Sequence, residues 1–274
     1  MSAEGFAATA AQGAVLRRAR PALGTLVELG LVAPAGVAAA SREAFAVTVL
    51  ASAWRALAAV ERALSAFDPD SDIGRFNAAP AGARLAVGPD AARVLGSAAS
   101  LAQETGGAFD VTLGTGPRGW RLERGPRGAL LHKDAASVRF DLGGIGKGHA
   151  VDRCFAALRS ALRLAGAPGG CWVNAGGDLR VAGLTVPVRL RDEGAGGARP
   201  WLALSGGALA TSAFGPGARA LLAGGPARAA QVSVAAPRCL WADALTKVVA
   251  LTGRADHPLL ARHGATAWIH RGSA

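Results

Sequence analysis

The chain has 274 residues, 51% of them hydrophobic, so it is long and apolar enough to bury a sizeable core. Its formal net charge is +11, but the arginines are scattered, they are not interleaved with aromatic side chains, and the sequence has no Tyr. This distribution argues against nucleic-acid binding. The three cysteines lack the spacing of a metal site or a disulfide framework and are expected to be small core residues.

The N-terminal part predicts no membrane anchor. The apolar run from Ala44 to Trp54 is too short to span a bilayer and is bracketed by charged residues, so we expect no membrane span. Residues 1–14 are small and weakly polar and are expected to form a flexible segment before a domain at 15–274. They contain neither a signal-peptide pattern nor a lipobox cysteine, which predicts a cytoplasmic protein, or a periplasmic one if the start is misassigned.

The first half of the chain predicts one strand and three helices. A strand is expected at 24–32, a helix at 89–105 that begins at a proline, and a helix that begins within 146–148 and ends before Gly166. Before these two helices, a long helix is expected at 41–67. Its buried stripe would consist of residues three or four apart, namely Phe45, Val49, Ser52, Ala56, Val60, Ala63 and Phe67.

After Gly170 the pattern changes to short strands separated by turns. We expect strands at 171–174, 179–181, 186–190, 201–204 and 231–235, then a helix at 241–252 and a strand at 265–269. Runs of helices and runs of strands that do not strictly alternate predict an α+β fold.

The segment DLGGIGKGHAVD at 141–152 joins a strand end, a glycine turn, a lysine and a helix start. Glycines let the backbone approach a ligand, and the N–H groups of a helix start together with the ammonium of Lys147 favour phosphate. The segment matches neither GxxxxGK[ST], because Gly148 follows the lysine, nor GxGxxG after a first strand. It predicts an anion-binding turn of another type, with an ordinary strand-to-helix turn as the alternative.

Two loop segments have both a structural and a functional interpretation. The segment 67–77 is either a turn after a helix or a loop in which Phe67 covers a flat ring. The segment 105–112 is either a helix end with an Asx turn or a place where Asp110 and Thr112 meet the polar edge of a ligand.

Two segments further along the chain also allow both interpretations. The segment 174–178, NAGGD, follows a strand and is most often a hairpin turn. Asp243 and Thr246 are three residues apart near a helix start, so they share a face. They are either an acidic residue favoured by the helix dipole beside a hydroxyl, or two hard oxygens of the kind that Mg²⁺ accepts.

In their order along the chain, these segments resemble the ApbE family of FAD:protein FMN transferases. The resemblance runs from about Arg17 to Leu251. It rests on ALGT at 22–25, LSAFDPDSDIGRFN at 64–77, GAFDVT at 107–112, DLGGIGKGHAVD at 141–152, VNAGGD at 173–178, ATS at 210–212 and ADALT at 242–246.

The resemblance implies a single compact ApbE-like domain of mixed antiparallel sheet with packed helices. It also implies a Mg²⁺-dependent enzyme that splits the pyrophosphate of FAD, transfers FMN to a Ser or Thr hydroxyl of an acceptor flavoprotein and releases AMP. By matching positions, Mg²⁺ would be held by Asp243, which is also the catalytic residue, by the carbonyl of Gly144 and by Thr246. The residues matched to FAD binding are Leu23, Phe67, Ala108, Phe109, Asp110, Asp141 and Lys147.

This chain departs from the family pattern at two places. The family commonly has Thr four residues after the metal-binding Asp, where this chain has Lys247. Either Thr246 is the ligand while Lys247 turns away or binds phosphate, or Lys247 replaces the metal.

The second departure concerns the general base. Between Phe214 and Trp241 the chain has no His, Asp or Glu, so the family's His-x-x-Asp-Pro-x-Thr-Gly-like segment is missing. His149 stands where the family tends to have an aromatic residue and is expected to be a packed helix-start residue. A non-catalytic FAD-binding protein, or an FAD hydrolase that gives FMN and AMP, are therefore the alternative functions.

Overall fold

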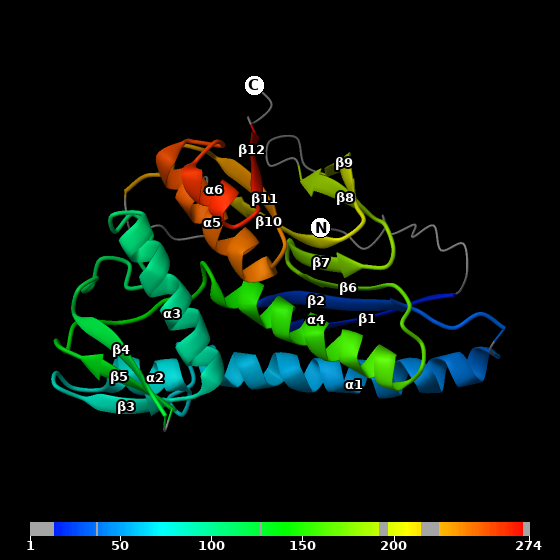
Figure 1. Ribbon diagram of the computed structural model, residues 1–274, viewed down its shortest axis with the longest axis horizontal. Coiled ribbons are helices and arrows are strands. Elements are labelled where there is room, and N and C mark those ends of the chain that lie inside the picture. The colour runs from blue at the N-terminus through cyan, green and yellow to red at the C-terminus, as the bar shows by residue number, and fades with distance from the viewer. Residues whose placement is uncertain (1–13, 37, 127, 192–196, 215–224, 271–274) are drawn as a thin grey trace.

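The computed structural model describes residues 14–36, 38–126, 128–191, 197–214 and 225–270. Within these ranges a seven-stranded sheet forms the centre of the fold, and every neighbouring pair of its strands is antiparallel (Figure 1). In spatial order its strands are β1 (Val15–Ala22), β2 (Thr25–Val32), β6 (Cys171–Ala175), β7 (Asp178–Ala182), β10 (Gly207–Ala213), β11 (Gln231–Ala236) and β12 (Thr266–His270).

Three long helices pack against this sheet. They are α1 (Ala39–Leu64), α4 (Gly146–Leu164) and α5 (Cys239–Thr252). Figure 1 shows α4 lying beside α1, with the first turn of α4 directed at the first turn of α5. Apolar side chains of β2, α1 and α4 share one buried cluster, which holds the start of α4 in a fixed place.

The remaining elements form a smaller lobe and a hairpin. The three-stranded sheet β3 (Arg84–Val87), β5 (Gly128–Lys133) and β4 (Trp120–Gly125) lies beside α2 (Asp72–Ala78) and α3 (Pro89–Glu104) (Figure 1). β8 (Val186–Arg191) pairs with β9 (Ala198–Leu204), and the short α6 (Pro258–Arg262) precedes β12. The α+β class and the mixed antiparallel sheet with packed helices are therefore confirmed.

The long first helix differs from its prediction in two respects. Its buried stripe is Ala46, Val49, Leu50, Ala53, Trp54, Leu57 and Val60. Of the predicted stripe, Val49 and Val60 are buried and Phe67 is exposed, and the other positions, Phe45, Ser52, Ala56 and Ala63, are partly buried. The helix also ends at Leu64, because Ser65 adopts an extended conformation and its hydroxyl accepts hydrogen bonds from the N–H groups of Phe67 and Asp68.

Among the described helices, α1 is the one that is long and apolar enough to cross a membrane by length and composition. Its buried face packs in the cluster shared with β2 and α4. The absence of a membrane span stays a prediction. Residues 1–13, expected to be flexible, lie outside the described ranges.

The three cysteines are buried and have no disulfide partner, as expected for small core residues. Burial raises the pKa of the Cys154 thiol to about 12 and that of Cys171 to about 11, so both thiols are protonated at neutral pH.

Candidate functional site

Helix α5 is buried on nearly every side, yet it carries three buried polar side chains within five residues. Asp243 and Thr246 are fully buried, and Lys247 is 4% exposed. A buried polar group costs free energy unless it has a partner, and a buried charge costs more. Each of these three side chains therefore has to be explained by what it contacts.

Asp243 meets the glycine turn that precedes α4. Its Oδ2 accepts a hydrogen bond of 3.1 Å from the N–H of Gly148 and lies 3.9 Å from Nζ of Lys147. Its Oδ1 forms an ion pair with Lys247, one helical turn further along α5. Burial alone would raise the pKa of Asp243, but the two ammonium groups and the Gly148 N–H hold it below its usual value, so Asp243 is ionised.

The close approach of the two helices requires glycine at position 148. A Cβ at Gly148 would lie 2.3 Å from the carbonyl oxygen of Cys239 and 2.8 Å from Cβ of Asp243, both far inside contact distance. The first turns of α4 and α5 therefore touch, which places Lys147 and Asp243 at one point although they are far apart in the sequence.

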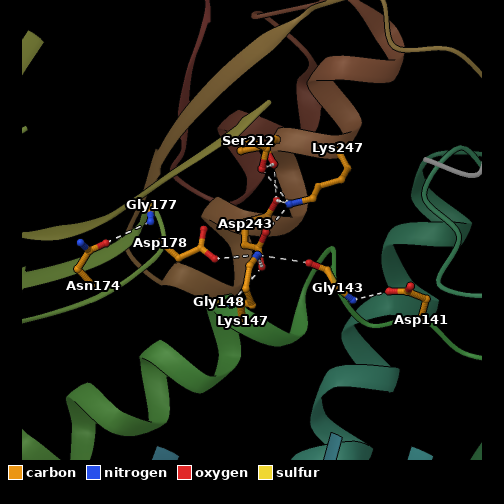
Figure 2. A network of polar contacts seen from close by, with 11 residues as sticks. Asp141, Gly143, Lys147, Gly148, Asn174, Gly177, Asp178, Ser212, Asp243 and Lys247 are labelled. Atoms are coloured by element: carbon orange, nitrogen blue, oxygen red, sulfur yellow. Dashed lines mark hydrogen bonds and ion pairs between the residues drawn. The ribbon is translucent and has the colours of Figure 1, made fainter. Parts of the chain in front are cut away.

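Lys147 also pairs with a second buried carboxylate. Its Nζ lies 3.1 Å from Oδ2 of Asp178, the first residue of β7, and 3.4 Å from the carbonyl oxygen of Gly143 (Figure 2). Burial alone would lower the pKa of Lys147, but Asp178 and Asp243 raise it above its ordinary value. The pKa of Asp178 is raised by its burial and by the negative charge of Asp243, against the attraction of the lysines.

Lys247 contacts the other oxygen of the Asp243 carboxylate, Oδ1. Its Nζ donates hydrogen bonds of 3.0 Å to Oγ of Ser212 and 3.2 Å to the main-chain carbonyl of Asp243, in addition to its ion pair with Oδ1 (Figure 2). The hydroxyl of Thr246 lies 2.9 Å from Oγ of Ser212 and donates to the same main-chain carbonyl at 2.7 Å.

We call Lys147, Asp178, Asp243 and Lys247 the charge cluster. Its two carboxylates and two ammonium groups balance in charge.

Contacts between turns bring further motifs to this cluster. The turn after β6 is closed by a hydrogen bond of 3.2 Å from the N–H of Gly177 to Oδ1 of Asn174. A Cβ on Gly176 would lie 2.4 Å from Oγ1 of Thr25, so this turn touches the β1–β2 turn. The N–H of Thr211 donates to the carbonyl of Gly177 at 3.2 Å, which continues the chain of contacts to Ser212.

The sequence signature of the ApbE family matches residues 23–215, which is well over half of the chain; the match includes the glycine turn with Lys147 and ends before α5. The chain belongs to the ApbE family. Among curated proteins none matches the chain in sequence.

Solved ApbE structures share the fold. The apo form of the flavinyl transferase ApbE of Pseudomonas stutzeri is 22% identical with a TM-score of 0.72, over 95% of this chain and 93% of that one. The ApbE protein of Thermotoga maritima is 21% identical with a TM-score of 0.71, over 95% and 97%. The flavin transferase ApbE of Vibrio cholerae is 22% identical with a TM-score of 0.67, over 87% of each chain.

Of the residues matched to FAD binding in ApbE proteins, Lys147 lies in the charge cluster and Asp141 lies beside it. The exposed Asp141 accepts a hydrogen bond of 2.7 Å from the N–H of Gly143. Its own N–H donates to the carbonyl of Val111 at 2.8 Å, which ties the GAFDVT segment to the glycine turn.

Two other matched residues have structural roles in this arrangement. Phe109 is 4% exposed and packs in the core of the smaller lobe. Both carboxylate oxygens of Asp110 accept local hydrogen bonds, Oδ1 from the N–H of Thr112 at 2.8 Å and Oδ2 from that of Gly114 at 2.9 Å. This is the Asx turn that was the structural alternative for the segment. Their contact with FAD stays a prediction.

The other matched residues lie at surfaces. Phe67 is 97% exposed, directly after α1. Leu23 has a positive φ of 54° in the turn between β1 and β2, and its N–H donates to Glu61 at 2.7 Å. Ala108 is partly exposed after α3. No hydrogen bond or ion pair found in the described ranges joins these three to the charge cluster, and their roles stay predictions.

The glycine turn is less open as a backbone anion site than its sequence predicts. The N–H groups of Gly143, Ile145, Gly146 and Gly148 already donate to protein oxygens. The side chain of Lys147 is 32% exposed, and its ammonium is therefore the group of this turn best suited to an anionic ligand.

The residues matched to Mg²⁺ do not fit a divalent ion as they are arranged. Both carboxylate oxygens of Asp243 and the hydroxyl of Thr246 have protein partners, and the aliphatic part of Lys247 lies against Gly144, 3.5 Å from the position of a Cβ there. Two unit charges 4 Å apart interact by about 4 kcal/mol at an effective dielectric constant of 20. A divalent ion beside Asp243 would be repelled by the ammonium of Lys247 about twice as strongly as a single charge. No group of three or more His, Cys, Asp or Glu side chains suited to a metal occurs in the described part of the chain.

Sequence reasoning missed three residues that build the site. Asp178 and Ser212 were noted only as parts of motifs. Asp152 accepts hydrogen bonds from the first two N–H groups of α5, those of Cys239 at 2.9 Å and Leu240 at 3.2 Å, and so fixes the helix that carries Asp243. Its position inside DLGGIGKGHAVD, one helical turn after Gly148, was the available signal.

His149 is a packed residue, as expected. Its Nε2 lies 2.8 Å from Oδ1 of Asp90, and the residue is 2% exposed. Burial lowers its pKa despite the attraction of Asp90 and Asp152. The segment 215–224, part of the stretch without an acidic residue or histidine, lies outside the described ranges.

A separate hollow lies away from the charge cluster. It has a volume of about 630 Å³, and it lies between α3 and β4 with Trp241 of α5 at its side. Three arginines are among the residues that line it, Arg93, Arg121 and Arg124. No residue matched to FAD or Mg²⁺ binding takes part in it.

Proposed function

We propose that this chain is a flavin transferase that binds FAD, cleaves its diphosphate and transfers FMN to a Ser or Thr hydroxyl of an acceptor flavoprotein, releasing AMP. The observation that carries the proposal is the contact between the glycine turn, with Lys147, and Asp243 in a chain of the ApbE family. The transferase names of the Pseudomonas stutzeri and Vibrio cholerae proteins support it.

The bond changes of this reaction balance without a co-reactant. The acceptor hydroxyl oxygen attacks the phosphorus on the FMN side, the bond from that phosphorus to the bridging oxygen breaks, and AMP leaves with the bridging oxygen. The proton of the hydroxyl passes to the phosphate of the departing AMP or to water. Phosphoryl transfer depends mainly on positioning and on stabilising negative charge.

Lys147 is suited to that task. The carboxylates of Asp178 and Asp243 keep its pKa above the ordinary value, so it carries its charge at neutral pH. A fixed ammonium beside a diphosphate stabilises the charge that develops on the leaving group. Asp243 holds this ammonium and the first turn of α4 in place. Because the matched residues do not fit Mg²⁺ as arranged, no step in this proposal depends on the metal.

The test is a transfer assay with a matched control. The purified chain is incubated with FAD and a flavoprotein domain that offers a Ser or Thr, once with Mg²⁺ and once with EDTA. We expect a mass increase equal to the FMN moiety on the acceptor and one AMP per adduct. Asp243→Asn is expected to abolish the adduct, whereas Asp256→Asn, on an exposed loop, is expected to retain it.

A non-catalytic FAD-binding protein is the second candidate. The stretch from Phe214 to Trp241 offers no acidic residue or histidine, and His149 is engaged by Asp90 inside the fold. A general base contributes roughly 10²–10⁴-fold to rate. FAD binding without adduct or AMP would favour this function, and AMP with free FMN would indicate a hydrolase. The cytoplasmic location stays a prediction.

A further inference from the structure

The ammonium of Lys247 has the surroundings of a bound cation. Three oxygens accept its hydrogen bonds: Oδ1 of Asp243, the main-chain carbonyl of Asp243 at 3.2 Å, and Oγ of Ser212 at 3.0 Å. An ammonium has three donors and no acceptor, so its capacity is filled. A carboxylate, a carbonyl and a hydroxyl are also the kinds of oxygen that Mg²⁺ takes in proteins.

The space around Lys247 is shaped to its side chain. Lys247 is 4% exposed. A Cβ on Gly144 would lie 3.5 Å, 3.6 Å and 3.8 Å from Cε, Cγ and Cδ of Lys247. The glycine turn therefore packs along the aliphatic part of Lys247 and leaves its ammonium facing Asp243. The side chain of Lys247 is therefore packed along its aliphatic part and hydrogen-bonded at its ammonium.

Charge balance in the cluster also disfavours a bound divalent ion. Asp178 and Asp243 are neutralised by Lys147 and Lys247, all within one set of contacts. An added divalent ion would face two ammonium groups, whereas Lys147, whose side chain is 32% exposed, can meet an anion from the solvent side.

We propose that the ammonium of Lys247 is the resident cation of this site and takes the place of a divalent metal ion, so that the chain binds the diphosphate of its dinucleotide without metal. Lys247 neutralises Asp243 from within the protein, and Lys147 meets the diphosphate. The identity of the dinucleotide as FAD rests on the proposed function.

The first experiment measures metal binding directly, without turnover. Mn²⁺ serves as the probe, and its free concentration is followed by electron paramagnetic resonance with the full chain, alone and with FAD. The unmodified chain is expected to bind no Mn²⁺ at the site. Lys247→Thr, which removes the ammonium and supplies a hydroxyl, is expected to bind about one ion per chain.

Lys247→Met is the matched control for this measurement, because it removes the charge and keeps the bulk without adding an oxygen. It is expected to bind Mn²⁺ at least about tenfold more weakly than Lys247→Thr. Circular dichroism checks that both variants are folded. If neither folds, the measurements on the unmodified chain decide alone.

The second experiment measures the FAD dissociation constant by titration calorimetry, with Mg²⁺ or with EDTA. For the unmodified chain the two values are expected to agree within about twofold, and for Lys247→Thr the value in EDTA is expected to be about tenfold weaker than in Mg²⁺.

The outcomes separate the two proposals. Stoichiometric Mn²⁺ binding by the unmodified chain, or FAD binding that it loses in EDTA, would overturn the role given to Lys247 while leaving the transferase proposal intact. A chain that binds no FAD under either condition contradicts the proposed function, and the Mn²⁺ measurement on the chain alone still decides the role of Lys247.

Discussion

Phe67 has an exposed aromatic ring, and its contribution to FAD binding can be measured. Its ring is 97% exposed just after α1, although aromatic side chains of this size are mostly buried. A ring that stacks on a flat ligand contributes about 0.5–1.5 kcal/mol beyond the area it covers. We therefore expect Phe67→Ala to weaken FAD binding roughly 2- to 12-fold, measured by calorimetry, without changing the free energy of unfolding.

Leu164→Ala is the control for this prediction. Leu164 is also a large exposed apolar residue, 87% exposed, but it ends α4 at the opposite end of that helix from Lys147. Its substitution should leave FAD affinity unchanged. Equal losses of affinity in the two variants would show that the effect at Phe67 is not a ligand contact.

At the scale of residues, the sequence predicts which side chains share one face of a helix, but not which side chains meet across the fold. A spacing of three on a helix predicts that the oxygens of Asp243 and Thr246 share a face, and their metal-binding role was what the family resemblance implied. The partners of Lys247 could not be found in this way, because Ser212 comes from β10 and Gly144 from a distant turn. Which oxygen an ammonium contacts depends on tertiary packing.

At the scale of elements, the contact between α4 and α5 decides whether the charge cluster forms. A Cβ at Gly148 would meet the carbonyl oxygen of Cys239 at 2.3 Å, and backbone on both sides leaves little room to shift. Overpacking of this kind costs about 1–3 kcal/mol. We expect Gly148→Ala to lower the free energy of unfolding by about that amount in urea titrations and to weaken FAD binding as well.

The matched substitution is Gly125→Ala at the end of β4. No heavy atom lies within 4 Å of a Cβ at that position, and its backbone has no positive φ. It should leave both stability and FAD affinity close to their original values. A Gly148→Ala protein as stable as this control would mean that the two helices can separate at no cost.

The elements found from the sequence are those with a strong apolar period or clear boundary residues. Helix α3 is one example, since it begins at Pro89 as predicted and ends one residue before the predicted end. Strand β1 was missed because VLRRARPA carries three arginines and lies at a sheet edge, and β10 because GALATSA has few β-branched residues. Helix α2 was expected to be a turn; its N-cap is Ser71, whose hydroxyl accepts from the N–H of Gly74 at 2.7 Å.

At the scale of the whole molecule, four histidines make stability depend on pH. Burial lowers the pKa of each below the ordinary value of 6.5; they are His149, His257, His263 and His270. Below pH 6.5 the unfolded chain binds protons that the folded chain does not, so the free energy of unfolding falls as the pH falls. Asp178, whose pKa is raised, acts in the opposite direction at lower pH, so the histidine contribution needs a comparison with a variant.

His149→Gln provides that comparison, because it removes the titration while an amide can still donate to Asp90. Asp90, Asp152 and Arg153 act electrostatically on the imidazole, and none of them is changed. One proton accounts for at most about 1.4 kcal/mol per pH unit. Between about pH 7.5 and about pH 5.5, urea titrations should show the unmodified protein losing more stability than His149→Gln, by up to this slope below pH 6.5. Parallel pH profiles would mean that His149 takes up its proton equally well in the folded and the unfolded chain. In that case burial beside Asp90 would not lower its pKa.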